Sequence, residues 1–174
     1  MNSANSPAKK KSSPRHTSIV NYEGKSMRQK ILAILLFTTF LAGCAGSVPR
    51  LGIINGELSP CPITPNCVNT QASTDVDTIQ PLLFTGTQAE AKERLLTVLK
   101  QMKRTRITQE REDYIRAESI SAMFRFVDDL EFYFPSQESG KIIIHARSAS
   151  RLGISDLGVN KKRIESIRDQ FNAN

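Results

Sequence analysis

The sequence predicts an α+β two-layer sandwich, in which a mainly antiparallel sheet of about four strands is flanked by an N-terminal and a C-terminal helix. Three observations support this prediction. Residues 87–104 and 160–172 each repeat apolar side chains at helical spacing, and the segment between them has the patterns of short strands. Strands joined by short turns pair antiparallel, and a sheet with one helix-covered face forms two layers.

Both predicted helices have recognisable boundaries. Thr87 and Glu90 form a Thr-x-x-Glu capping box at the start of the first helix. The apolar residues that follow at helical spacing are Ala91, Leu95, Val98, Leu99 and Met102. The second helix is expected to begin near Asn160, a favourable N-cap residue. Its apolar face consists of Ile164, Ile167 and Phe171.

The predicted strands lie between the two helices, at residues 104–110, 114–124, 130–134 and 142–148. The second strand shows the alternation expected of a half-buried sheet. Ile115 and Ala117 lie on one of its faces, and Arg116 and Glu118 lie on the other. The sequence therefore predicts a sheet with one apolar face and one charged face.

Length and charge limit the classes of function. The chain has 174 residues, which suits one domain at the usual ~100–200 residues. Its formal charge is +7, but seven of the 24 basic residues and only one of the 17 acidic residues precede residue 44. Nucleic-acid binding needs the basic excess on the folded part of a protein. We therefore expect no nucleic-acid partner.

The first 43 residues have the features of an export signal. Basic residues at 28–30 precede an uncharged apolar run at 31–41, which is shorter than the ~20 residues of a spanning helix. The run ends in Leu41-Ala42-Gly43-Cys44, which resembles the lipobox of bacterial lipoproteins. The resemblance implies that Cys44 is lipidated and becomes the mature N-terminus, so that the chain is tethered to a membrane without crossing it. The alternative is an uncleaved apolar stretch.

The lipoprotein interpretation divides the chain into three parts: a leader at 1–43 whose first 26 residues are a polar extension, a tether at 44–57, and a domain at 58–174. Ala45, rather than aspartate, follows the cysteine. By resemblance to lipoproteins of double-membrane bacteria, this favours an outer-membrane lipoprotein facing the periplasm, with inner-membrane anchoring as the alternative.

The number and spacing of the cysteines and histidines favour structural roles over metal binding or catalysis. After lipidation of Cys44, an even pair remains at Cys61 and Cys67, which predicts a disulfide in an oxidising compartment. The spacing of this pair is not Cys-x-x-Cys, and no second pair of zinc ligands lies nearby, so we expect no metal site and no cofactor. His145 is the only histidine after the leader. No motif of nucleophilic catalysis accompanies it, which favours a structural histidine.

Three motifs resemble the DUF1499 family, a bacterial and plastid group without an assigned activity. They are Cys-Pro-x-x-Pro-Asn-Cys at 61–67, the pair Asp128-Asp129, and Arg-Ser-x-Ser-Arg-x-Gly-x-Ser-Asp-x-Gly-x-Asn at 147–160. The resemblance covers nearly all of residues 58–172. It implies a common fold unit and no mechanism.

The third motif allows two interpretations. Lys161, Lys162 and Arg163 lie in the first turn of the second helix, where the helix dipole disfavours cations. An unfavourable placement of charge often indicates a functional site, and at a helix N-terminus the expected ligand is an anion. Its candidate residues are Arg147, Ser148, Ser150, Arg151, Asn160 and Arg163. The structural interpretation, which we favour, instead pairs the arginines with Asp128, Asp129 or Asp156.

These observations favour a non-enzymatic, membrane-tethered periplasmic lipoprotein with a binding or envelope-support role. Its partners would be the membrane and a small anion or envelope component; no protein partner is specified. The alternative is a hydrolase acting on an anionic envelope component, with Asp128 or Asp129 as base, His145 nearby, and Arg147 or Arg151 as anion clamp. A pocket that holds Asp129, His145 and Arg151 together would favour the enzyme. A flat surface there, with all the arginines paired, would favour the binding module.

Overall fold

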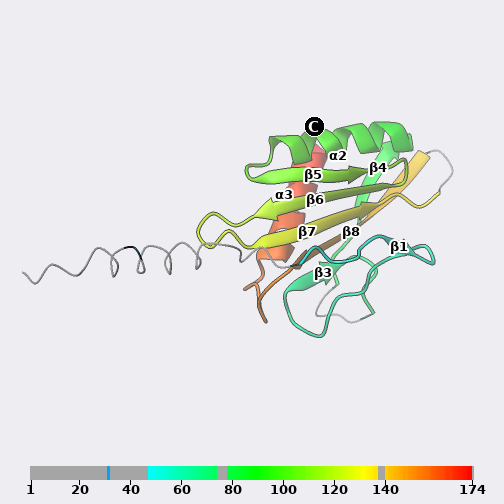
Figure 1. The fold of residues 1–174 in the computed structure, drawn as a ribbon. Coiled ribbons are helices and arrows are strands. Elements are labelled where there is room, and N and C mark those ends of the chain that lie inside the picture. Colours follow the sequence, from blue (N-terminus) through cyan, green and yellow to red (C-terminus); the bar gives the residue numbers. More distant parts are fainter. Residues whose placement is uncertain (1–30, 32–46, 74–77, 137–139, 174) are drawn as a thin grey trace, which may run out of the picture. The chain divides into compact units, whose positions relative to one another are not determined.

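Antiparallel pairing between segments that follow one another in the chain builds most of the sheet (Figure 1). The computed structural model describes residues 31, 47–73, 78–136 and 140–173. The elements in order are β1 (Ile53–Ile54), β2 (Glu57–Leu58), β3 (Cys67–Asn69), β4 (Leu82–Gly86), α2 (Gln88–Gln101), β5 (Thr105–Glu110), β6 (Tyr114–Ile120), β7 (Val127–Tyr133), β8 (Gly140–Ser150) and α3 (Val159–Ala173). This composition confirms the α+β class.

The main sheet has six strands rather than about four. Strand order is β3-β8-β7-β6-β5, and β4 also pairs with β8. The extra strands β3 and β4 are short and lie one after the other along β8, opposite residues 147–149 and 140–144. Their strand conformation comes from pairing with β8. Segments of only three and five residues are too short for their own residue pattern to predict this pairing.

Both helices pack on the same face of the sheet. The Thr87 side chain accepts a hydrogen bond from the Glu90 N–H, and the Glu90 carboxylate accepts one from the Thr87 N–H, so the predicted capping box is confirmed. The core side chains of β6, β7 and β8 cluster with those of α2 and α3. They include Ile115, Leu130, Phe132, Ile144, Leu95, Leu99, Ile164 and Phe171. Alternation along each strand therefore sends the intervening charged residues to the other face.

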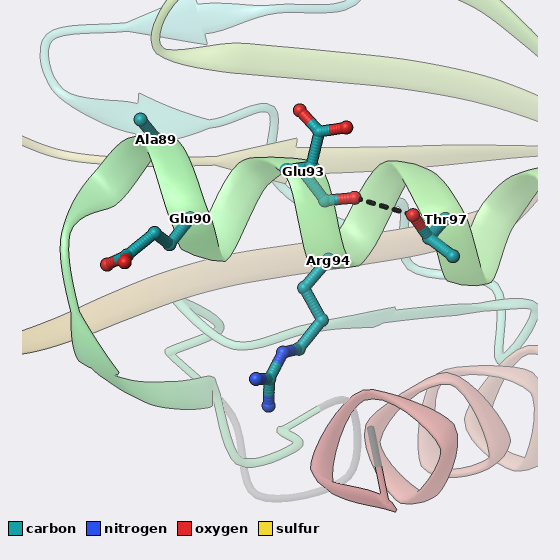
Figure 2. A pocket seen from close by; sticks show the side chains of 5 residues that line it. All are labelled: Ala89, Glu90, Glu93, Arg94 and Thr97. Carbon is teal, nitrogen blue, oxygen red and sulfur yellow. Dashed lines mark hydrogen bonds between the residues drawn. The ribbon is translucent and has the colours of Figure 1, made fainter.

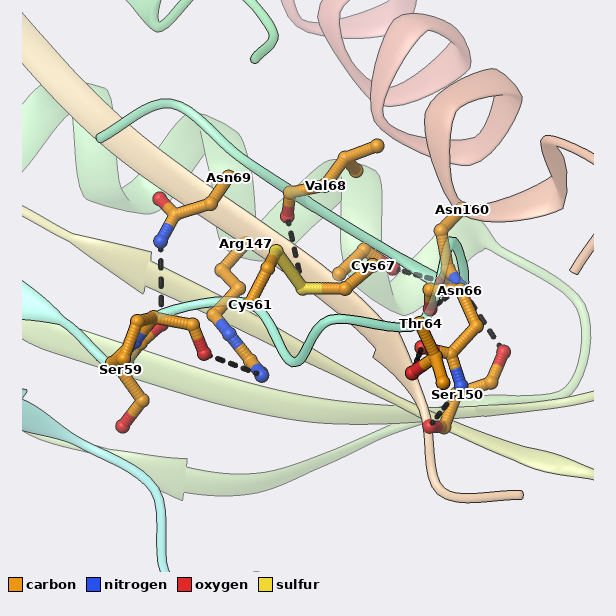
Figure 3. The surroundings of a disulfide bond; sticks show 12 residues. Ser59, Cys61, Thr64, Asn66, Cys67, Val68, Asn69, Arg147, Ser150 and Asn160 are labelled. Carbon is orange, nitrogen blue, oxygen red and sulfur yellow. Dashed lines mark hydrogen bonds between the residues drawn. A yellow bond between two sulfur atoms is a disulfide. The ribbon is translucent and has the colours of Figure 1, made fainter. Parts of the chain in front are cut away.

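The segment from Ser47 to Pro62, which precedes β3, lies over part of this second face. It contains the β1-β2 hairpin, which falls partly within the predicted tether, and β2 contacts β7 and β8. The predicted disulfide is confirmed: Cys61 and Cys67 are bonded, with their Cα atoms 5.6 Å apart. Because Cys67 also pairs with Ala149 of β8, the bond ties the loop to the sheet (Figure 3).

The buried core of the described residues lies between Leu58 and Phe171. Residues 45–174 therefore contain all of it and form a unit for study in solution. The leader and Cys44 lie outside the described residues, apart from Ile31. In the part of the chain that the structure describes, no helix has the length and apolar character needed to cross a membrane.

The disulfide should contribute measurably to stability. In residues 45–174, replacing both Cys61 and Cys67 with Ser should lower the free energy of unfolding by about 2–2.5 kcal/mol, because the unfolded chain loses the closure of a short loop. Urea denaturation of the parent and the double variant measures the difference. A pair of curves that superimpose would show that the bond does not constrain the chain.

Candidate functional site

The second face of the sheet carries a row of charged side chains from three adjacent strands. Strand register places Glu118 of β6 opposite Asp129 of β7, and places Glu131 of β7 between Arg116 of β6 and Arg147 of β8. All of these positions are on one face, because side chains alternate along a strand. The sheet thus brings together basic and acidic groups that are far apart in the sequence.

Arg151 is the most strongly paired of these residues. Its Nε donates to Asp129 Oδ2 at 2.7 Å, and its Nη2 donates to Asp129 Oδ1 at 2.8 Å and to Glu118 Oε1 at 2.5 Å. Arg116 Nη2 donates to the same Asp129 Oδ1 at 2.6 Å. The Arg151 and Asp129 side chains are 5% and 1% exposed. These four residues therefore form a network in which every charged group is paired.

The charge states in this network follow from its geometry. Burial raises the pKa of Asp129, but hydrogen bonds from Arg151 and Arg116 outweigh burial, so this pKa lies below its usual value. The hydrogen bond from Arg106 is the largest influence on Glu118 and, with Arg151, lowers the pKa of Glu118 despite partial burial. Both carboxylates are thus held ionised, which suits ion pairing and is unfavourable for a general base at neutral pH.

Arg147 pairs with a residue that the sequence did not single out. Its Nη1 donates to Glu131 Oε2 at 3.0 Å, and Glu131 Oε1 accepts from the Tyr114 hydroxyl at 2.7 Å. Burial raises the pKa of Glu131, against the opposing influence of Tyr114 and Arg147. Arg147 Nη2 also donates to the carbonyl of Pro60 at 3.4 Å, so this pair joins the disulfide loop to the sheet (Figure 3).

The other half of the predicted anion site lies on the helix-covered face. Ser148 and Ser150 point there, and Arg163 of α3 donates to Asp128 Oδ2 at 2.5 Å. The Asn160 side chain accepts from Ser148 and Arg163 and donates to the backbone carbonyl of Asn66 at 3.0 Å. Asn160 is fully buried in the first turn of α3. The six candidate residues are therefore divided between two faces and do not form one site.

Asp156, three residues before the first residue of α3, performs the capping role that the sequence predicted for Asn160. Its Oδ1 accepts from the Gly158 N–H at 2.9 Å, and its Oδ2 accepts from the Asn160 N–H at 2.7 Å. These bonds satisfy backbone donors at the start of α3 and place negative charge where the helix dipole favours it. Asp156 therefore acts through backbone contacts.

The residues proposed for a hydrolase are also separated. His145 lies opposite Tyr133, whereas Asp129 lies opposite Ala149, four residues further along β8. At ~3.3 Å per strand residue the two side chains are about 13 Å apart along the sheet. The His145 Nδ1 contacts the Thr70 hydroxyl at 3.1 Å, and burial lowers the pKa of the imidazole. Asp128 points to the opposite face from both.

Two of the hollows in the described part of the chain differ in their relation to the predicted site residues. One, of about 460 Å³, lies between the Ser47–Pro62 segment and β8, and its wall includes Asp129, Arg147 and Arg151. The other, of about 550 Å³, follows α2, where Arg94 points towards α3 (Figure 2). The Arg94 guanidinium lies 4.8 Å from the centre of the Phe84 ring. The second hollow contains none of the predicted site residues.

Among the described residues, no group of three or more His, Cys, Asp or Glu side chains is arranged to hold a metal ion. The polar residues that sequence reasoning missed are Arg116, Glu118, Glu131 and Asn66. The alternation at 114–120 shows that Arg116 and Glu118 share a face, but only the strand register identifies their partners.

Comparison with known proteins gives one match. A family model described as "Protein of unknown function (DUF1499)" matches residues 57–171. Searches of curated proteins and of solved structures each found no match.

Removing Arg151 should strongly destabilise the domain. Arg151→Ala leaves Asp129 buried with one fewer partner, so the free energy of unfolding should fall by about 3–5 kcal/mol. Arg106→Ala is the matched control, because Arg106 also pairs with Glu118 but its side chain is 76% exposed. The control should change stability by about 1 kcal/mol or less.

Urea denaturation in the presence and absence of sulfate separates the two interpretations of this region. A small loss of stability in Arg151→Ala, together with sulfate stabilisation of the parent protein that this variant lacks, would contradict the structural role and support an anion site.

Stability should also depend on His145 between about pH 7 and pH 5. Burial lowers the pKa of His145 in the folded state, so its contribution is complete above the unfolded pKa of about 6.5 and is lost as pH falls through the folded pKa. Melting temperatures of residues 45–174 should decline over this interval, and His145→Gln should flatten the decline. Parallel profiles for the parent and variant would rule out this linkage.

Proposed function

Because this chain belongs to the DUF1499 family, whose description gives no activity, we propose its function from its own leader and fold. The protein is exported and anchored to a cell-envelope membrane through a lipid on Cys44. Its folded domain is a non-enzymatic module with a binding or envelope-support role. The outer membrane, with the domain facing the periplasm, is the favoured location.

The observation that carries this proposal is the pairing of the cysteines. Cys61 and Cys67 are bonded, and structural disulfides persist in oxidising compartments outside the cytosol. Export therefore agrees with the disulfide and with the apolar run at 31–41. The third cysteine, Cys44, stands in Leu-Ala-Gly-Cys, where the resemblance to the lipobox implies lipidation.

The arrangement of the charged residues supports a binding or support role over catalysis. Arg116, Arg147, Arg151 and Arg163 each form a salt bridge with a carboxylate, and none of their side chains is more than 12% exposed. General acid–base work needs a titrating group within hydrogen-bond reach of substrate. The groups of the proposed hydrolase are instead engaged with one another or separated along the sheet.

Lipidation of Cys44 is directly testable. Cells expressing the full chain and given a radiolabelled or alkyne-tagged fatty acid should label the parent protein, and Cys44→Ser should abolish the label because the acceptor thiol is gone. Cys61→Ser is the control, which should retain the label even if the domain is less stable. Equal labelling of the parent and Cys44→Ser would refute the anchor, and fractionation of the labelled protein would identify the membrane.

A further inference from the structure

Large apolar side chains are exposed at one end of the domain, where three loops meet. The loops are the β6–β7 turn at 121–126, the β8–α3 connection at 151–158 and the disulfide loop at 61–67 (Figure 1). The Arg151 N–H donates to the Val127 carbonyl, and the Asn66 side chain donates to the Gly153 carbonyl at 2.7 Å. We call these three loops together the loop end.

Four large apolar side chains of the loop end are mostly exposed to solvent. Leu157, Met123, Ile154 and Phe124 are 88%, 81%, 77% and 64% exposed. Phe124 stacks on the partly exposed Phe126 with 5.6 Å between ring centres. Gathered apolar side chains of this kind mark an interaction surface, whereas scattered ones need no explanation.

The apolar loops are held in place by their own hydrogen bonds. The Ser121 N–H donates to the Phe126 carbonyl at 2.9 Å, and the Phe126 N–H donates to the Ser121 hydroxyl at 2.9 Å. Asp156 fixes the other connection through the backbone of residues 158 and 160. The loop end therefore presents its apolar side chains on a preformed surface.

Cations surround this apolar surface. The exposed basic residues are Lys103, Arg104, Arg125, Lys161 and Lys162, and none of them forms a salt bridge within the described residues. Arg104 lies next to the loop end, because its carbonyl accepts from the N–H of Ile120, the residue before the β6–β7 turn, at 2.9 Å. Within 121–126 and 151–162 the one acidic residue is Asp156, whose carboxylate already caps α3. Apolar tips with a basic rim match an anionic lipid surface.

The start of the folded domain lies at the same end. Ser47 and Pro49 line one cavity together with Ser150 and Arg151. Cys44 precedes Ser47 by three residues, which span at most about 11 Å when extended. A lipid on Cys44 would thus keep the loop end close to the membrane. This step, unlike the preceding ones, rests on the proposed anchor.

We propose that the loop end docks on anionic phospholipid. The side chains of Met123, Phe124, Ile154 and Leu157 enter the interfacial region of the leaflet, and the surrounding lysines and arginines contact the headgroup phosphates. This contact also gives a role to Lys161 and Lys162, two cations that the dipole of α3 disfavours.

The absence of tryptophan from the chain allows a direct test. Residues 45–174 carrying Phe124→Trp are mixed with vesicles of phosphatidylcholine and phosphatidylglycerol in equal parts. We expect a blue shift of the emission and protection from acrylamide, because the indole moves from water into lipid. Ile154→Trp is a second reporter at the loop end. Leu83→Trp is the matched control, since Leu83 is 48% exposed on β4.

The contribution of Lys161 and Lys162 to lipid binding is tested in the Phe124→Trp variant. Phe124→Trp combined with Lys161→Glu and Lys162→Glu should need about tenfold more lipid for half of the shift, because each basic side chain near an anionic surface favours binding. Vesicles of phosphatidylcholine alone should give a weaker shift. An equally strong shift with neutral lipid, or with the charge-reversed protein, would overturn the electrostatic part of the proposal.

Three results would overturn docking itself. They are unchanged emission of both loop-end reporters at high lipid, an equal shift of the Leu83→Trp control, and a shift that depends on protein concentration without vesicles, which would assign the surface to a second copy of the chain. Fatty-acid labelling of Cys44 is read independently. A labelled protein without the shift contradicts docking alone, and a shift without labelling contradicts the anchor alone.

Discussion

The contact on which this domain depends most is the buried pair between the Arg151 guanidinium and the Asp129 carboxylate. Arg151 is the first residue after β8, where the connection to α3 begins, and the pair also engages Arg116 and Glu118 of β6. Three strands are therefore joined through side chains at the point where their loops diverge. Because an uncompensated buried charge is costly, the loops beside it are confined to arrangements that keep the pair closed.

Local patterns predicted the parts of the fold that local interactions determine. The capping box and the helical spacing of apolar residues predicted α2. The even pair of cysteines that remains after Cys44 predicted the disulfide. Strands β3 and β4 escaped prediction because their conformation depends on pairing with β8, which is distant in sequence. The same limit applies to the site. Arg147 was expected to pair with an aspartate, but cross-strand register gives it Glu131, and register cannot be read from one strand alone.

The three cations in the first turn of α3, which the helix dipole disfavours, are accommodated in two different ways. Arg163 breaks the dipole preference and is compensated inside the protein by Asp128 and by the side chain of Asn160. Lys161 and Lys162 break it on the exposed side. Arg163 thus fastens the helix to the sheet, and the two exposed lysines remain available for contacts outside the domain.

The neighbouring acids of β7 have a consequence for how the sheet assembles. Asp128 is bound by a helix on one side, and Asp129 is bound by two arginines on the other. A slip of β7 by one residue would turn Leu130 to the charged face, and it would move at least one of the two carboxylates away from the arginines that pair with it. The two acids thus tie the alignment of β7 to both faces of the sheet, because a one-residue slip leaves at least one buried carboxylate without its partner.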